Sequence, residues 1–187
     1  MKTLLIDNGT TLVEKLKKLL PGDPQVTQWD TFQEQEVEEY DLIILSGGSV
    51  RPLKGNEHLF ARELHFLQQT RKPVIGICFG CELIVKAFGG DIRPLSSPHR
   101  GIRTIQISTG LLGPSDPRTT VEVYEQHQWI IDTIPEQFNV LAWTSEGPEM
   151  IRHQTLPIVG IQFHPENFVD TTDGDEIFFQ VINELRQ

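Results

Sequence analysis

The chain has 187 residues, of which 38% are hydrophobic and 22% charged, an ordinary composition for a globular protein that excludes collagen-like, disordered and disulfide-dense classes. A chain of this length buries roughly 70% of its unfolded surface, so we expect one self-sufficient domain over residues 1–187. The formal net charge of −10 repels phosphate backbones and anionic lipid surfaces, which argues against nucleic-acid and membrane partners.

The apolar stretches indicate neither a secretion signal nor a membrane span. The first stretch, at residues 3–6, is interrupted at once by Asp7 and is too short for a signal peptide. No run approaches the roughly 20 apolar residues that a transmembrane helix requires. We therefore expect a cytoplasmic location.

In its first half, the chain alternates short apolar strands with helices. Strands are expected at residues 4–6, 26–29, 41–45 and 74–77. Helices are expected at residues 11–20, 32–40, 57–69 and from the end of the last strand to about 88. Short strands without strict alternation, each followed by a helix, indicate a parallel sheet covered on both faces. The predicted fold is therefore α/β, with a doubly wound, mostly parallel sheet.

The pattern changes near Gly101 to alternating polar and apolar residues, which is typical of exposed or antiparallel strands. Strands are expected at 102–107, 121–124, 140–143 and 158–163, the last two bracketing a turn rich in Gly and Pro. A closing helix is expected at 174–185, with Asp173 as its N-cap and Glu176 three residues on. This half predicts a small antiparallel extension of the sheet.

The sharpest local signal lies at residues 76–80, which read Gly-Ile-Cys-Phe-Gly between a buried strand and a helix. This is the cysteine version of the nucleophile elbow, a tight turn that needs small neighbours around its central residue. We expect the sulfur of Cys78 to be exposed near the helix N-terminus, where the helix dipole favours the thiolate. The alternative is a buried cysteine flanked by packing glycines.

A thiolate nucleophile needs a base, and His164 in Phe163-His164-Pro165-Glu166 is the best candidate. It follows an apolar strand, where open α/β sheets place their sites. Glu166 lies two residues on and can accept a hydrogen bond from the other imidazole nitrogen, which fixes the tautomer. A histidine at a strand end can also be purely structural, but the two motifs together favour catalysis.

With these motifs the chain resembles the class I (triad-type) glutamine amidotransferases over nearly its whole length. The resemblance rests on the elbow around Cys78, the stretch at 160–166, the Leu-Ser-Gly-Gly loop at 45–48 and the segment around His127. It implies a flavodoxin-like sheet and hydrolysis of the glutamine side-chain amide through a γ-glutamyl thioester on Cys78. Ammonia would pass to a separate synthase of the GMP synthase type or the chorismate type, and His164 would be base and acid, oriented by Glu166.

The resemblance also implies the remaining site residues. The backbone N–H groups of Gly48 and Phe79 would form the oxyanion hole. Substrate contacts would come from Gly47, Glu82, His127, Gln128 and Trp129. A simple Gly-Gly turn and core packing by Trp129 are the competing interpretations of these positions.

Two positions depart from the family pattern. Ser49 stands where the family usually has proline, and Glu82 stands where it usually has glutamine. A carboxylate at position 82 attracts an ammonium group and repels a carboxylate, which favours a γ-glutamyl compound with an altered α-carboxylate. Alternatively, Glu82 points to solvent or to Lys86, one helical turn on.

Cys78 and Cys81 also form a C-x-x-C motif, which thioredoxin-like redox proteins use at a helix start. The order of the predicted elements argues against that fold, but a regulatory disulfide between the two cysteines remains a hypothesis. The cysteines and scattered histidines have no zinc-type spacing, so neither a metal nor a cofactor is expected. His99 is expected in a surface loop.

Three functions therefore stand at this point. The leading hypothesis is a glutaminase that supplies a synthase partner. The second is a stand-alone hydrolase of γ-glutamyl peptides or amides, suggested by Glu82 and Ser49. The third is a non-catalytic regulatory module, against which the intact Cys78, His164 and Glu166 argue.

Overall fold

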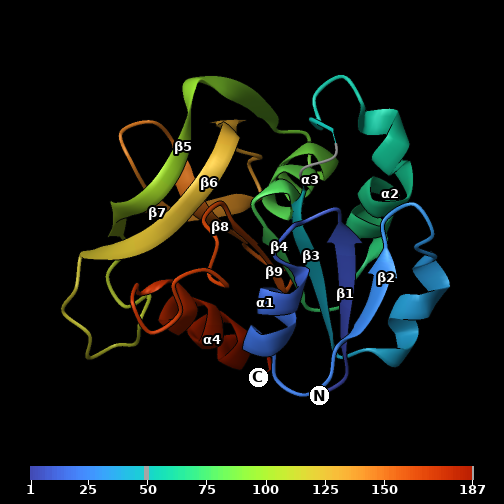
Figure 1. Cartoon of the computed structure of the whole chain (residues 1–187), viewed down its shortest axis with the longest axis horizontal. Helices are drawn as coiled ribbons and strands as arrows, with labels where there is room; N and C mark the ends of the chain where they lie inside the picture. Colours follow the sequence, from blue (N-terminus) through green and yellow to red (C-terminus); the bar gives the residue numbers. More distant parts are fainter. Residues whose placement is uncertain (49–50, 187) are drawn as a thin grey trace.

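The computed structural model describes residues 1–48 and 51–186, and these residues form a nine-stranded sheet flanked by helices (Figure 1). The strands are β1 (Thr3–Asn8), β2 (Gln25–Gln28), β3 (Leu42–Gly48), β4 (Val74–Ile77), β5 (Asp91–Ile107), β6 (Thr120–Thr133), β7 (Phe138–Trp143), β8 (Pro148–His153) and β9 (Ile158–Ile161). The helices are α1 (Val13–Leu19), α2 (Ala61–Gln69), α3 (Phe79–Ala87) and α4 (Gly174–Glu184), with 3-10 segments η1 (Glu34–Glu39) and η2 (Glu57–Phe60).

The sheet has a parallel part and an antiparallel part. Its strand order is β2-β1-β3-β4-β9-β8-β7-β5-β6. The first five of these strands pair in parallel, and the pairs from β9–β8 to β5–β6 are antiparallel. This mixed α/β sheet confirms the predicted fold class, with the antiparallel extension following the parallel strands.

Alternate residues of the parallel strands face two separate cores. Leu5 and Ile44 pack with residues of α1 and α4 on one face of the sheet. Leu4 and Ile43 pack with residues of α2 and α3 on the other. Figure 1 shows α1 and α4 together in front of the parallel strands. The helices therefore cover both faces, as the continuous apolar strands predict. Among the described residues, no helix is long and apolar enough to cross a membrane.

The structure corrects three sequence-based expectations in the second half. The predicted Gly- and Pro-rich turn contains β8, whose residues pair with both β7 and β9; Gly147, which precedes it, and Pro148, its first residue, are typical of turns in the sequence. His99 lies in β5, not in a surface loop. Asp173 precedes α4 but makes no capping bond, because its carboxylate binds Arg118 and the N–H of Glu122 instead.

The strand order brings three chain segments to one edge of the sheet. β3, β4 and β9 are neighbours and run parallel, so their carboxyl ends lie together. Gly48 ends β3, Cys78 directly follows β4, and His164 comes three residues after β9. The long β5–β6 ribbon curls over this edge (Figure 1), and the backbone of Tyr124 in β6 accepts a hydrogen bond from His164 N–H at 2.8 Å.

Candidate active site

Cys78 sits on a strained turn between β4 and α3. Its φ is 50° and its ψ −103°, a conformation that residues with a side chain rarely adopt. A Cβ atom at Gly76 would lie 2.4 Å from the carbonyl oxygen of Gly80, and one at Gly80 would lie 2.4 Å from that of Leu45. Both glycines are therefore required, as the elbow motif predicts. The sulfur is not exposed as expected, because Cys78 is only 6% accessible.

We expect Gly80→Ala to destabilise the fold by about 3 kcal/mol or more, since the new methyl group meets backbone that has little freedom to move. Chemical denaturation of the purified variant measures this loss. Gly174→Ala is the control: its Cβ atom would lie 3.4 Å from its nearest neighbour, an ordinary contact, so the free energy of unfolding should change by less than about 1 kcal/mol. Equal stability of the two variants would contradict the close packing of the elbow.

His164 and Glu166 form the second part of the site. The imidazole Nδ1 lies 2.9 Å from Oε1 of Glu166, and both side chains are buried. In the neutral ring this contact places the proton on Nδ1 and leaves Nε2 as the nitrogen that faces the thiol side. The structure thus brings together Cys78, His164 and Glu166, the three residues that the sequence predicts. Only Pro165 separates His164 from Glu166 along the chain.

The ionisation of the thiol and the imidazole depends on their contact. Burial raises the pKa of the Cys78 thiol, and the hydrogen bond and charge of His164 offset only part of this increase. Burial would lower the pKa of His164, but its interactions with Cys78 and Glu166 outweigh that effect and raise the pKa well above its usual range. The thiol therefore needs an adjacent base, and His164 is basic enough to accept its proton; the helix N-terminus does not ionise it alone.

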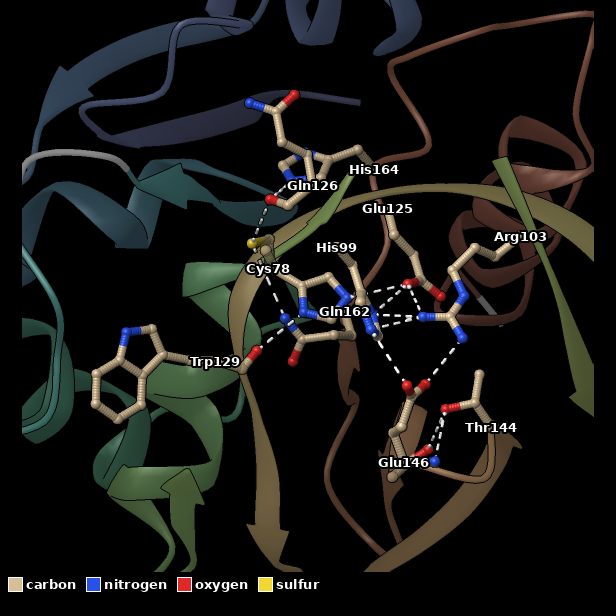
Figure 2. Close-up of polar contacts among 12 residues, drawn as sticks. Cys78, His99, Arg103, Glu125, Gln126, Trp129, Thr144, Glu146, Gln162 and His164 are labelled. Carbon is tan, nitrogen blue, oxygen red and sulfur yellow. Dashed lines mark hydrogen bonds and ion pairs between the residues drawn. The ribbon is translucent and has the colours of Figure 1, made fainter. Parts of the chain in front are cut away.

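Two polar groups complete the surroundings of the sulfur. The carbonyl oxygen of Gln126 in β6 lies 3.3 Å from Nε2 of His164 and 4.0 Å from the sulfur (Figure 2). On the other side, the Gln162 amide Nε2 donates to the sulfur at 3.9 Å. The Gln126 carbonyl accepts from the thiol, and from Nε2 of His164 when that nitrogen carries a proton, while the Gln162 amide favours negative charge on the sulfur.

The glycine loop at the end of β3 packs directly against these residues. A Cβ atom at Gly47 would lie 3.1 Å from Cε1 of His164 and 3.8 Å from Cβ of Cys78, so Gly47 packs against these two side chains and is not among the residues that line the cavity. Gly48 and Phe79 line the cavity beside Cys78. Phe79 begins α3, where the first N–H groups have no acceptor within the helix. Ser49 lies outside the described residues.

A cavity of about 620 Å³ opens beside Cys78 and is lined by residues from four segments of the chain. Its lining residues are Gly48, Arg51, Pro52, Cys78, Phe79, Glu82, Pro98, His99, Arg100, Gln126, His127, Gln128 and Trp129. The set includes all of the predicted substrate contacts except Gly47. Sequence reasoning missed Arg51 and Arg100, the latter in β5, because a single arginine carries no motif.

Glu82 faces this cavity from the first turn of α3. It is 4% exposed, and burial raises its pKa to about 8. Neither alternative proposed for it from the sequence holds, since it does not point to solvent and Lys86 instead pairs with Asp91 at 3.1 Å and with Glu57 at 3.9 Å. The cavity therefore contains a carboxyl group that ionises easily only when a cation approaches.

Cys81 has a different environment from Cys78. Both cysteines are free thiols, and Cys81 is fully buried. Its sulfur packs against β9, where a Cβ atom at Gly160 would lie 2.6 Å away. Burial, with a contribution from Glu82, raises the pKa of this thiol well above its usual range. Cys81 is therefore placed as a packing residue, and the structure gives no support to a disulfide with Cys78.

Comparison with known proteins shows which family the chain is similar to. The model of the family described as glutamine amidotransferase class-I matches residues 4–185. One of the subunits of a glutamine-hydrolysing GMP synthase from Pyrococcus furiosus is 29% identical over 97% of this chain and 99% of its own length. Aminodeoxychorismate synthase from Streptomyces griseus is 30% identical over 95% of this chain, which spans only 25% of that protein. A crystal structure of a glutamine amidotransferase from Thermotoga maritima superposes with a TM-score of 0.78 at 13% identity, covering 98% of this chain and 97% of that one.

Proposed function

Because the chain belongs to the class-I glutamine amidotransferase family, we propose that it hydrolyses the side-chain amide of glutamine on Cys78 and supplies the ammonia to a separate synthase. The observation that carries this proposal is the Cys78–His164–Glu166 arrangement at the carboxyl ends of neighbouring strands, beside a cavity. We further propose that residues 1–187 fold as one domain and act in the cytoplasm without a cofactor.

The first half of the reaction forms a thioester. His164 Nε2 takes the thiol proton as the sulfur of Cys78 attacks the amide carbon, and Glu166 stabilises the resulting imidazolium. The N–H groups of Gly48 and Phe79 receive the negative oxygen of the tetrahedral intermediate. His164 then returns the proton to the departing nitrogen, so the C–N bond breaks and ammonia leaves.

The second half regenerates the enzyme. With the proton gone, His164 is again neutral and accepts a proton from a water molecule that attacks the thioester carbon. The C–S bond breaks, the sulfur regains its proton through His164, and glutamate is released. Gln162 assists by donating to the sulfur while it carries negative charge.

The far end of the substrate is held by charge. The carboxylate of Glu82 accepts hydrogen bonds from the α-ammonium group. Burial alone favours the neutral carboxyl group of Glu82, and the positive charge of the substrate favours the ionised one. Arg51 and Arg100 line the same cavity and supply positive charge for the α-carboxylate. Backbone groups of Gln128 and Trp129, on β6, complete the contacts.

Substrate binding should therefore depend on the ionisation of Glu82. Because its pKa is raised to about 8, the carboxyl group is mostly neutral at pH 7 and half ionised at pH 8, so KM for glutamine should fall about fivefold over this interval. Glu82→Gln removes this titration, and its KM should lack the fivefold fall. Steady-state kinetics of both proteins at matched pH values measure the difference; a parallel pH dependence would contradict the role of Glu82.

The synthase partner is of the GMP synthase or chorismate type. The Pyrococcus furiosus relative belongs to a glutamine-hydrolysing GMP synthase, whereas the Streptomyces griseus relative is an aminodeoxychorismate synthase of which this chain matches a quarter. Both support transfer of ammonia to a second enzyme. Activation of glutamate release by one candidate synthase, and not the other, would identify the partner.

A second candidate function is hydrolysis of γ-glutamyl peptides, favoured by the buried carboxyl group of Glu82 in the cavity. A peptide-bonded α-carboxylate brings no negative charge near Glu82. Comparing glutamate release from glutamine and from a γ-glutamyl dipeptide, with Cys78→Ala as control, tests both functions. Preference for glutamine supports the glutaminase, Cys78-dependent turnover of the dipeptide alone supports the peptidase, and no turnover with any candidate synthase present would favour a non-catalytic module.

A further inference from the structure

A second group of converging side chains lies in the β5–β6 ribbon, beside the proposed catalytic residues. His99 and His127 are directly opposite each other in the strand pairing, and Glu125 lies two residues before His127 on the same face of β6. Gly101 pairs with Glu125 across the ribbon and has no side chain that could pack against the Glu125 carboxylate. Figure 2 shows His99 and Arg103 gathered around Glu125.

Three lone pairs meet within this group. One ligand atom each from His99, Glu125 and His127 lie within 4.8 Å of one another. Nδ1 of His99 is 3.0 Å from Oε2 of Glu125, and Nε2 of His127 is 3.4 Å from the same oxygen. Ligands about 2.1 Å from a tetrahedral zinc ion lie about 3.4 Å apart, so these distances match a shared ion.

Each histidine has an acceptor for a proton on the nitrogen that points away from the group. Nδ1 of His127 donates to the carbonyl oxygen of Trp129 at 3.1 Å, which leaves the lone pair on Nε2. Nδ1 of His99 faces Glu125 at 3.0 Å and Nε2 faces Glu146 at 3.3 Å, so an ion bound between Nδ1 and Glu125 would leave the ring proton on Nε2, toward Glu146. A histidine fixed by an acceptor on its far nitrogen is typical of metal ligands.

A separate observation is that buried atoms of this group lack hydrogen bonds. Within the described residues, Nε2 of His127 and Oε1 of Glu125 have no hydrogen-bond partner. Glu125 is fully buried and His127 is 6% exposed. Nε2 of His127 faces the other oxygen of Glu125, Oε2, at 3.4 Å, and two acceptors at that distance away from water repel unless a proton or a cation lies between them.

Arg103 supplies part of the missing positive charge. Its Nη1 lies 2.7 Å from both ring nitrogens of His99 and 3.5 Å from Oε2 of Glu125, while its Nη2 binds Glu146 at 2.9 Å. The arginine side chain is one-third exposed and keeps Glu146 as a partner when Nη1 moves away. It therefore competes with a metal ion for His99 and Glu125 without closing the site to it.

We propose that His99, Glu125 and His127 bind a divalent transition-metal ion such as Zn²⁺ in the wall of the active-site cavity. The ligand set is two imidazoles and one carboxylate, which suits zinc and leaves a fourth position for water. The assignment does not depend on the proposed amide hydrolysis, because no proton transfer or bond change in that reaction uses these three side chains. A bound ion would cross-link β5 and β6. Two of its ligands, Glu125 and His127, are the neighbours of Gln126, whose carbonyl oxygen contacts the sulfur of Cys78.

The test is direct binding of Zn²⁺ to the full chain carrying Cys78→Ala, so that the nucleophilic thiol cannot bind the ion. Competition with a chromogenic zinc chelator should give one ion per chain, and Co²⁺ should give the visible bands of a four-coordinate nitrogen and oxygen site. Glu125→Gln and His127→Gln should each weaken Zn²⁺ binding at least about 100-fold. Arg103→Gln should tighten it about tenfold, because a competing charge is removed.

The control is His65→Gln, which removes an exposed histidine that pairs with Glu34 on another face and should leave binding unchanged. If His127→Gln fails to fold, His99→Gln, at a less buried ligand, decides the question. Absence of stoichiometric binding, or binding insensitive to the ligand variants, would overturn the proposal and assign the contact to an imidazolium–carboxylate pair. Weaker binding by Arg103→Gln would also count against it.

Discussion

Replacing Cys78 with alanine is expected to lower kcat for glutamate release from glutamine by roughly four to six orders of magnitude. The substitution removes the nucleophile, and the residual rate reflects only binding and the oxyanion contacts. The strained backbone accommodates alanine as it does cysteine, so the free energy of unfolding should change by less than about 1 kcal/mol. Steady-state assays together with chemical denaturation measure both quantities.

Cys81 provides the matched control for this experiment. It is the other cysteine of the chain and lies three residues further on, in the first turn of α3, but its sulfur packs against Gly160. Cys81→Ala should therefore keep kcat within a few-fold while lowering stability by about 1–2 kcal/mol through the lost packing. A Cys78→Ala variant that retained activity, or a Cys81→Ala variant that lost it in a folded protein, would contradict the proposed nucleophile.

Replacing His164 with asparagine is expected to lower kcat about 10⁴-fold, the second-largest effect. Because burial raises the pKa of Cys78, the thiol cannot ionise readily once its base is gone. The same variant should react much more slowly than wild type with iodoacetamide at neutral pH, a readout of thiol ionisation that does not depend on substrate. Unchanged alkylation of Cys78 would show that His164 does not activate it.

The Glu166→Gln variant tests how far activity depends on the orientation and tautomer of His164. Glu166→Gln keeps the size of the side chain, but its amide donates to Nδ1 of His164 and so favours the tautomer with the proton on Nε2. We expect a fall in kcat of about 10³-fold with little change in KM. His65→Asn, an exposed histidine on α2, serves as the control and should leave kcat unaltered.

The elements of the fold that local pattern specifies were predictable from the sequence. The apolar run at 74–77 and its glycine-flanked cysteine could be read directly, because close packing at Gly76 and Gly80 permits no side chain. Glu166 was predictable for the same reason, since two residues suffice to turn its carboxylate toward His164. The placement of Cys78 on its turn and of Glu166 beside His164 therefore follows from local sequence.

What the sequence could not predict depends on register between distant strands. His99 and His127 are 28 residues apart and become neighbours only through the pairing of β5 with β6. β8 was missed because Gly147 and Pro148 indicate a turn, while burial between β7 and β9 makes the segment that follows a strand. The depth of Cys78 was misjudged for a related reason: β6 covers the sulfur and comes from a distant part of the chain.

The most direct test of the central claim is to map the cysteine modified by a glutamine-analogue chloroketone at neutral pH. The account predicts one label per chain, on Cys78, that free glutamine prevents and that removes glutaminase activity in proportion to labelling, while Cys81 stays unmodified. Equal labelling of Cys81, or turnover of glutamine by a protein whose Cys78 does not react, would contradict it.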